Sequence, residues 1–179
     1  DFLARARTLD RPFCLFVSLV NPHDIGFYPD GWKDGGYRRE EFANLGISLP
    51  PNFADDLMTK PKIQREARAA FDKLAPLAGT DAQREYVNFY AFLHKVVDGH
   101  IMKILDALDA HGLTESTIVV RSADHGELGL SHGMREKSYS AYEEMIHIPL
   151  VVSNPILYPE PLETQAFYSH LDLLPTLAE

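Results

Sequence analysis

The sequence predicts an α/β fold in which a mostly parallel sheet is sandwiched by helices. Three short stretches are continuously apolar and rich in Val, Ile or Phe, the pattern of strands buried on both faces of such a sheet: residues 13–20, 117–123 and 148–154. An amphipathic segment between the first two predicts a right-handed crossover helix. The 179 residues are enough for one domain with its own core.

The first expected strand, FCLFVSLV at residues 13–20, leads directly into the polar sequence NPHD. Its continuous apolar character predicts that Cys14 is a core residue. His23 then lies at the carboxyl end of the strand, where parallel sheets bind ligands.

Residues 24–79 interrupt the alternation of strands and helices. They mix Gly, Pro and charged residues, and they read as one long irregular excursion, which in a compact domain is usually functional or disordered. Their aromatic residues favour an ordered loop near a site: Phe27, Tyr28, Trp32 and Tyr37.

A long helix is expected over residues 81–111. Thr80 and Gln83 match a capping box at its start, and Gly112 stands where a terminating glycine belongs. Apolar residues recur at spacings of three and four along it, and they predict the face that packs on the sheet: Phe89, Leu93, Val97, Ile101, Ile104 and Leu108.

The second expected strand, residues 117–123, ends at Asp124 and His125. A carboxylate beside an imidazole suits a divalent cation, and Gly126 permits the tight exit that two adjacent ligands require. The alternative is that Asp124 caps the following turn and His125 is a satisfied polar residue. Since His23 ends the first strand, we expect all three side chains on one rim of the sheet.

Composition narrows the classes of partner. The net charge of −9 argues against a nucleic acid or an anionic membrane surface, although a local cluster of cations can still bind a small anion. The sequence contains no run of about 18 apolar residues, so no membrane-spanning helix is expected. A single cysteine excludes an internal disulfide.

Four blocks together resemble the sulfatase family of the alkaline-phosphatase-like superfamily. They are the region of NPHD, the stretch ending in SADHGELG, the segment SHGMREKSYSAYEEMIHIPLVV, and SHLDLLPTL. Their order and spacing match from about residue 11 onward. The resemblance implies an alkaline-phosphatase-like fold, incomplete here, with residues 1–179 as part of the catalytic domain.

The resemblance also implies roles for individual residues. Asp124 and His125 correspond to ligands of a divalent metal, most often Ca²⁺, with Mn²⁺ possible. His23 and Lys137 correspond to catalytic residues that contact the sulfate, and His132 is expected at the substrate. For His132 as for His170, a structural role bonded to the backbone is weighed against this and is favoured.

The departures from the family pattern matter as much. The motifs CxPSR and SxPxR, whose Cys or Ser becomes the formylglycine nucleophile, do not occur, and neither do the family's amino-terminal Asp-Asp ligands or its small carboxy-terminal domain. The isolated chain is therefore expected to be inactive, with formylglycine supplied by an upstream segment.

The resemblance implies that the complete protein hydrolyses small sulfate monoesters, as arylsulfatases do. Two alternatives remain open. One is a phosphonate monoester or phosphodiester hydrolase of the same superfamily, because sulfuryl and phosphoryl transfer make similar demands on these residues. The other is a non-catalytic, sulfatase-like binding module.

Overall fold

The computed structural model describes residues 2–137 and 139–179. The helices are α1 (Phe2–Ala6), α2 (Lys62–Leu74), α3 (Gly79–Ala110), α4 (Glu143–Ile146) and α5 (His170–Ala178). The strands are β1 (Val119–Ser122) and β2 (Leu150–Ser153). Short 3₁₀ helices are η1 (His23–Phe27), η2 (Gly31–Gly35), η3 (Arg39–Glu41), η4 (Leu57–Thr59) and η5 (Ser131–Gly133).

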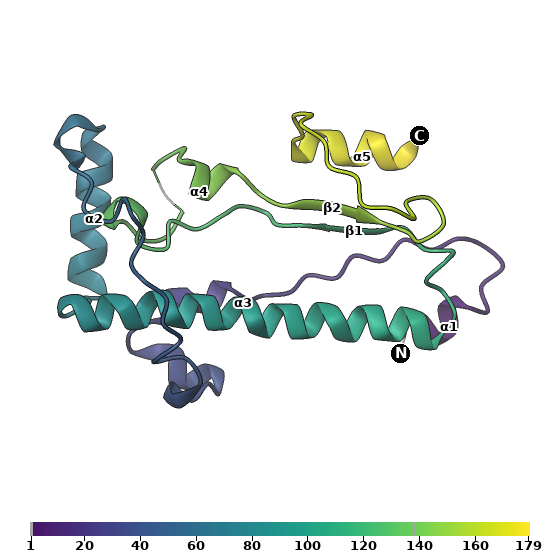
Figure 1. Cartoon of the computed structure of the whole chain (residues 1–179), viewed down its shortest axis with the longest axis horizontal. Helices are drawn as coiled ribbons and strands as arrows, with labels where there is room; N and C mark the ends of the chain where they lie inside the picture. Colours follow the sequence, from purple (N-terminus) through teal and green to yellow (C-terminus); the bar gives the residue numbers. More distant parts are fainter. Residues whose placement is uncertain (1, 138) are drawn as a thin grey trace.

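The elements are arranged in layers around α3, the longest helix. Figure 1 shows β1 and β2 as a thin layer running alongside α3, with α5 on the side of that layer away from α3. This is the expected α/β organisation, with a small sheet. No helix in the described part of the chain is long and apolar enough to cross a membrane.

The two strands pair antiparallel, with Val119 opposite Ser153 and Ser122 opposite Leu150. The expectation of parallel pairing is therefore wrong for these two strands. Parallel neighbours need a connection that travels back along the whole strand. In the described part of residues 123–149 the chain forms η5 and the one-turn helix α4, and it comes back beside β1 running in the opposite direction (Figure 1).

Residues 13–20 do not form the expected strand. Within the described residues the only sheet contains β1 and β2, and the 13–20 segment has no strand partner. Phe16 is 80% exposed, and Cys14, expected in the core, is exposed as well. An apolar segment forms a buried strand only where other elements pair with it and cover it. Among the described residues, no strand pairs with residues 13–20.

The long helix is confirmed, with small differences at its ends. The structure begins it at Gly79, whose φ is +77°, so Thr80 lies inside the first turn and the capping box is wrong. Gly112 adopts φ +62°, and its N–H donates to the Asp109 carbonyl at 2.9 Å. That is the left-handed termination that the sequence predicts.

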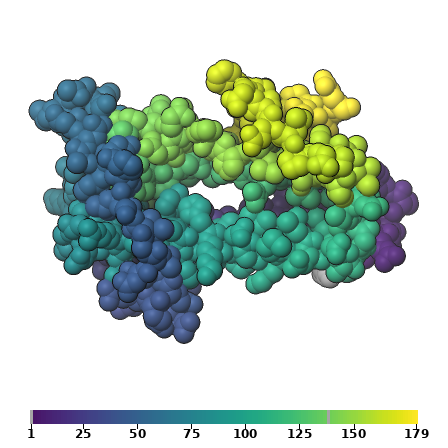
Figure 2. Space-filling model, viewed as in Figure 1, coloured from purple at the N-terminus to yellow at the C-terminus, as the bar shows by residue number. Residues whose placement is uncertain are grey.

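The apolar face of α3 is buried at its two ends rather than along its whole length. Phe89 and Leu93 are fully buried in the main core, and Leu108 packs in a second core with Leu3 and Leu113. The three expected core residues between these ends are only half-buried: Val97, Ile101 and Ile104. Figure 2 shows an opening between the middle of α3 and the strand layer.

The excursion at residues 24–79 is ordered and partly helical. Tyr28 and Trp32 lie in the main core, where the ring of Tyr28 is 5.9 Å from that of Phe89. The 13-residue helix α2 was not expected. Its Ala, Arg, Glu and Gln content favours a helix, and a proline directly before Lys62 is a common helix start.

Candidate functional site

Asp124 and His125 follow β1 and lie against each other. Nε2 of His125 is 3.4 Å from Oδ2 of Asp124, and the His125 backbone N–H donates to Oδ1 of Asp124 at 3.1 Å. The Asp124 side chain is 87% exposed and that of His125 is 42% exposed. The pair therefore faces solvent, with its oxygen and nitrogen atoms available to a ligand.

The other ring nitrogen of His125 is bonded to the backbone. Nδ1 lies 2.8 Å from the Gly126 carbonyl oxygen, which only accepts, so Nδ1 carries the proton. Nε2 is the ring nitrogen that faces the Asp124 carboxylate, and it is the one that would bind a metal, with Nδ1 held by the backbone as in many metal-binding histidines. If two ligand atoms each lie about 2.4 Å from a Ca²⁺ ion and form a right angle at the ion, they are roughly 3.4 Å from each other. The measured separation fits a shared cation.

The exit from the pair is held tightly against α4. The Gly126 N–H donates to the Met145 carbonyl at 2.8 Å, and the Glu127 N–H donates to the Glu144 carbonyl at 3.0 Å. A methyl group at position 126 would overlap the Glu144 carbonyl oxygen. Glycine is therefore required at position 126 because two backbones approach closely. From the sequence, the glycine was expected only because of the tight turn.

Glu127 ties the start of the following loop to its end. One of its carboxylate oxygens accepts the Gly129 N–H at 3.1 Å and the Glu136 N–H at 2.7 Å. Burial raises the pKa of Glu127, and the nearby Glu136 adds to that rise, while these backbone bonds and Lys137 oppose it. Glu127 was not predicted as a functional residue, although its place directly after Asp-His-Gly was a signal.

Lys137 extends from the end of that loop. Its Nζ lies 3.8 Å from Oε2 of Glu136, and its side chain is 30% exposed. Glu136 also approaches η1, since a methyl group on Gly26 would lie 3.3 Å from Oε1 of Glu136. The turn that carries His23 and the loop that carries Lys137 therefore lie close together.

His23 opens η1 and is exposed. Its side chain makes no hydrogen bond or ion pair within the described residues. In the same part of the chain, no such bond joins the Asp124–His125 pair to His23 or to Lys137. The structure thus shows two separate parts of the candidate site: the Asp124–His125 pair after β1, and the turn of η1 close to the Lys137 loop. Their convergence on one rim stays a prediction.

His132 lies in η5 with both ring nitrogens occupied by side chains. Nδ1–H donates to Oδ2 of Asp55 at 2.8 Å, and Nε2 accepts from Nδ2 of Asn52 at 3.3 Å. The ring stacks on Tyr142 with centroids 3.8 Å apart, and only 13% of the side chain is exposed. Asn52 also donates to Glu144 at 2.9 Å. No local sequence pattern predicted these partners of His132, because they are distant in the sequence.

His170 opens α5, and its Nε2–H donates to the carbonyl oxygen of Ala123 at 2.8 Å. The carbonyl belongs to the residue directly before Asp124. This is the backbone bond expected of a structural histidine, and it attaches α5 to the end of β1.

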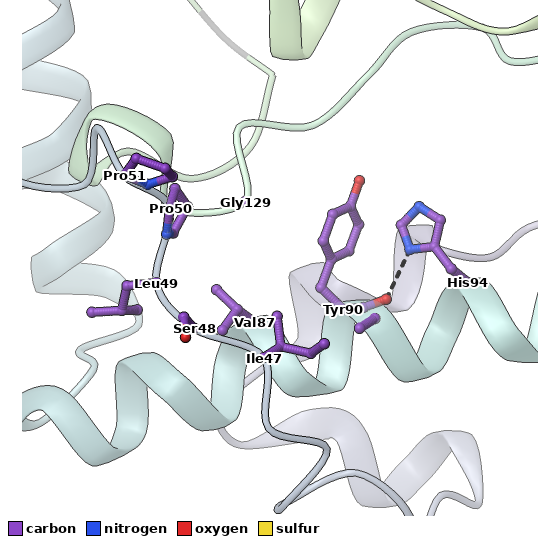
Figure 3. Close-up of a pocket in the computed structure, with 10 residues that line it drawn as sticks. Ile47, Ser48, Leu49, Pro50, Pro51, Val87, Tyr90, His94 and Gly129 are labelled. Carbon is purple, nitrogen blue, oxygen red and sulfur yellow. Dashed lines mark hydrogen bonds between the residues drawn. The ribbon is translucent and has the colours of Figure 1, made fainter.

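An apolar pocket adjoins the same loop. It has a volume of about 660 Å³ and lies between α3 and the segment that crosses it at residues 47–51 (Figure 3). Val87, Tyr90 and His94 form its α3 side, and Gly129 contributes from the loop. Nδ1–H of His94 donates to the Tyr90 carbonyl at 2.9 Å, so that ring is held along the helix.

Comparison with known proteins places this geometry in context. The family model described as Sulfatase matches residues 1–179. The chain belongs to the sulfatase family. Its relatives include arylsulfatase K of Xenopus laevis, which is 35% identical over 181 residues, covering 97% of this chain and 33% of the relative. The delta 4,5-hexuronate-2-O-sulfatase of Bacteroides thetaiotaomicron is 29% identical, covering 94% of this chain and 36% of the relative.

The uncharacterized sulfatase YidJ of Escherichia coli is 29% identical over 177 residues, covering 99% of this chain and 33% of that protein. Among solved structures, a 2-O GAG sulfatase aligns with a TM-score of 0.56 at 26% identity, covering 75% of this chain and 30% of that one. The likeness confirms the alkaline-phosphatase-like fold class. The chain spans about a third of the length of these relatives.

Proposed function

We propose that residues 1–179 are the central part of the catalytic domain of a sulfate monoester hydrolase. The nucleophile segment and the carboxy-terminal subdomain would lie outside this stretch. The observation that carries the proposal is the Asp124–His125 pair, whose facing atoms are 3.4 Å apart in a chain matched along its length by the sulfatase family.

Asp124 and His125 would hold the divalent metal, for which Ca²⁺ is the first choice and Mn²⁺ the second. No group of three or more metal-binding side chains occurs among residues 2–137 and 139–179, so further ligands would come from elsewhere in the protein. When bound, the cation would offset the negative charge that collects on the sulfate oxygens. The bond from Nδ1 to the Gly126 carbonyl would orient the ring so that Nε2 of His125 points to this site.

Lys137 would place an ammonium group on the sulfate oxygens, where charge grows as the sulfuryl group leaves. This position of Lys137 is supported by Glu127, whose carboxylate accepts hydrogen bonds from both ends of the loop before Lys137, at Gly129 and Glu136. His23 would donate a proton to the bridging oxygen as the S–O bond breaks. The close approach of Glu136 to Gly26 supports a common location for His23 and Lys137.

His132 would brace this arrangement rather than bind substrate directly. Its two nitrogens already have partners in Asp55 and Asn52, and its ring is covered by Tyr142. These contacts attach the loop before Lys137 to the excursion at residues 24–79. The strained backbone of the loop supports a bracing role, because Leu130, His132 and Glu136 all adopt positive φ.

The substrate would be a small sulfate ester. The names of the relatives include an arylsulfatase, a hexuronate-2-O-sulfatase and a 2-O GAG sulfatase, which together favour an aryl or sugar leaving group. The overall charge of −9 speaks against nucleic acid as a partner.

The test compares three esters with the full-length protein: an aryl sulfate, an aryl phosphonate monoester and an aryl phosphodiester. We expect the highest kcat/KM on the sulfate, and we expect Lys137→Ala to lower it by about 100-fold, the usual effect of losing one transition-state contact. Lys95→Ala, at an exposed position of α3, is the matched control and should be neutral. Faster turnover of the phosphonate or the phosphodiester would contradict the proposal.

A further inference from the structure

A hydrogen-bond network holds the turn that carries His23 on both sides. The side-chain amide of Asn21 donates to the hydroxyl of Tyr37 at 2.6 Å, and that hydroxyl donates to the carboxylate of Asp24. The Asp24 N–H closes the network by donating to Oδ1 of Asn21 at 3.3 Å. Tyr37 is therefore bonded to the residues that bracket Pro22 and His23.

The position of Tyr37 is in turn fixed by α3. Its ring packs edge-on against Phe89 at 5.4 Å and against Phe92 at 5.9 Å. A methyl group at Gly35 would overlap the Tyr37 ring, so the chain also approaches it closely from η2. Since Phe89 is fully buried, the hydroxyl of Tyr37 is anchored to the main core.

His23 itself has no side-chain partner in the described part of the chain, and it is exposed. The backbone of its turn therefore sets the position and the Cα–Cβ direction from which the imidazole extends. We propose that Tyr37 is a positioning residue that aims His23 at the leaving-group oxygen by pinning Asn21 and Asp24. This inference rests on the proposed function and adds a residue to it.

The chemistry of the step gives the inference a distinctive signature. As the formylglycine hydrate of the upstream segment forms a bond to sulfur, the S–O bond to the leaving group breaks. Its electron pair stays on the leaving oxygen, and the proton from His23 moves to that oxygen. An acidic phenol leaves readily without this proton, whereas a basic alkoxide depends on it. Proton transfer requires close alignment of donor and acceptor. A misplaced His23 therefore lowers the rate more for esters with a more basic leaving group.

The experiment is the Tyr37→Phe variant of the full-length protein, assayed with sulfate esters from 4-nitrophenyl sulfate to a simple alkyl sulfate. The variant keeps the ring packing and removes only the hydroxyl. We expect kcat/KM to change by less than about twofold on 4-nitrophenyl sulfate and to fall at least about 10-fold on the alkyl sulfate, part of the general-acid contribution. Tyr28→Phe, in the same core but bonded to Glu85, is the matched control and should leave the whole series unchanged.

A second variant, Asp24→Ala, removes the other partner of the same hydrogen bond and tests the inference if Tyr37→Phe disturbs folding. It should give the same dependence on the leaving group, and the double variant should lose little more than either single one. An equal loss on every ester, or no loss on the alkyl sulfate, would overturn the positioning role. Absence of sulfate-ester turnover in the unmodified protein would overturn the proposed function, and this inference with it.

Discussion

The absence of a side chain at Gly126 allows the backbone after the Asp124–His125 pair to pack closely against its neighbour. Gly126 separates the two candidate ligands from Glu127, and its backbone lies against that of Glu144. The neighbour is main chain, which cannot rotate away as a side chain can. A glycine at this position is therefore a requirement of packing, independent of any role in binding.

Replacing Gly126 by Ala should lower the free energy of unfolding by about 1–3 kcal/mol, the usual cost of overpacking. Gly99→Ala is the matched control, since Gly99 lies within α3 with no atom near its missing side chain. That change should raise stability by about 0.5–1 kcal/mol, as alanine favours helices. Thermal unfolding of the full-length variants measures both, and equal melting temperatures would contradict the close approach.

Asp55 should make stability depend on pH in the acid range. Its hydrogen bond from His132 is the main cause that holds its pKa below the usual value, with Lys60 adding to the effect. A carboxyl whose pKa is lowered by folding stabilises the protein above its unfolded pKa of about 3.9, and the contribution is lost as the pH falls through the lower, folded pKa.

The Asp55→Asn variant should therefore melt below the parent at neutral pH, and the gap should narrow as the pH is lowered from about 5 to about 3. Melting curves at a series of pH values provide the measurement. A gap that stays constant over this range would show that the charge of Asp55 plays no part.

At the scale of elements, α3 supports the site through its two ends. Its first half carries Phe89 and Leu93 into the core that also holds Tyr28 and Trp32, and its last turn buries Leu108. The first of these cores supports η1, and the second adjoins the start of β1 through Val119. The helix thus connects the supports of the two pieces of the candidate site.

Phe89→Ala should cost about 3–5 kcal/mol of unfolding free energy, because the ring is fully buried among aromatic neighbours. Val97→Ala, on the same face but half-buried, should cost distinctly less. The comparison is made by denaturation of the full-length protein. Equal losses would indicate that the middle of α3 is as well covered as its first half.

The long helix and its end were predictable from the sequence because their signals are local, although the local signals of α2 were overlooked and the capping box was wrong. The periodicity of α3 and the left-handed Gly112 depend only on neighbouring residues, and both were found. The segment at residues 13–20 was misread because its apolar pattern says nothing about whether a strand lies beside it. Tyr37 and Asp55 were not assigned roles because their partners are distant in the chain, and only folding shows which polar groups meet.

At the scale of the whole molecule, apolar surface remains uncovered on several elements. Phe167 is fully exposed and Leu171 is 87% exposed beside the strand layer, and Phe16 is 80% exposed in the 13–20 segment. Patches of this kind normally mark surfaces that contact other protein. They agree with the proposal that residues 1–179 are part of a larger catalytic domain.

The isolated chain should accordingly bind Ca²⁺ or Mn²⁺ weakly and should not turn over sulfate esters. Two protein ligands leave most positions on a calcium ion to water, and the chain contains no formylglycine motif. Calorimetric titration of the purified 1–179 chain and of its Asp124→Ala variant measures the first point. Tight binding that survives the substitution would show that the metal is held elsewhere.

The most direct test of the Asp124–His125 site is aryl sulfate turnover by the full-length protein and its Asp124→Ala and His125→Ala variants, with the isolated chain assayed alongside. Asp98→Ala, at an exposed position of α3, is the matched control. We predict that either site variant loses about 100- to 1000-fold in kcat/KM, that the control matches the parent, and that the isolated chain is inactive. An Asp124→Ala variant as active as Asp98→Ala, or turnover by the isolated chain that Asp124→Ala abolishes, would contradict the account.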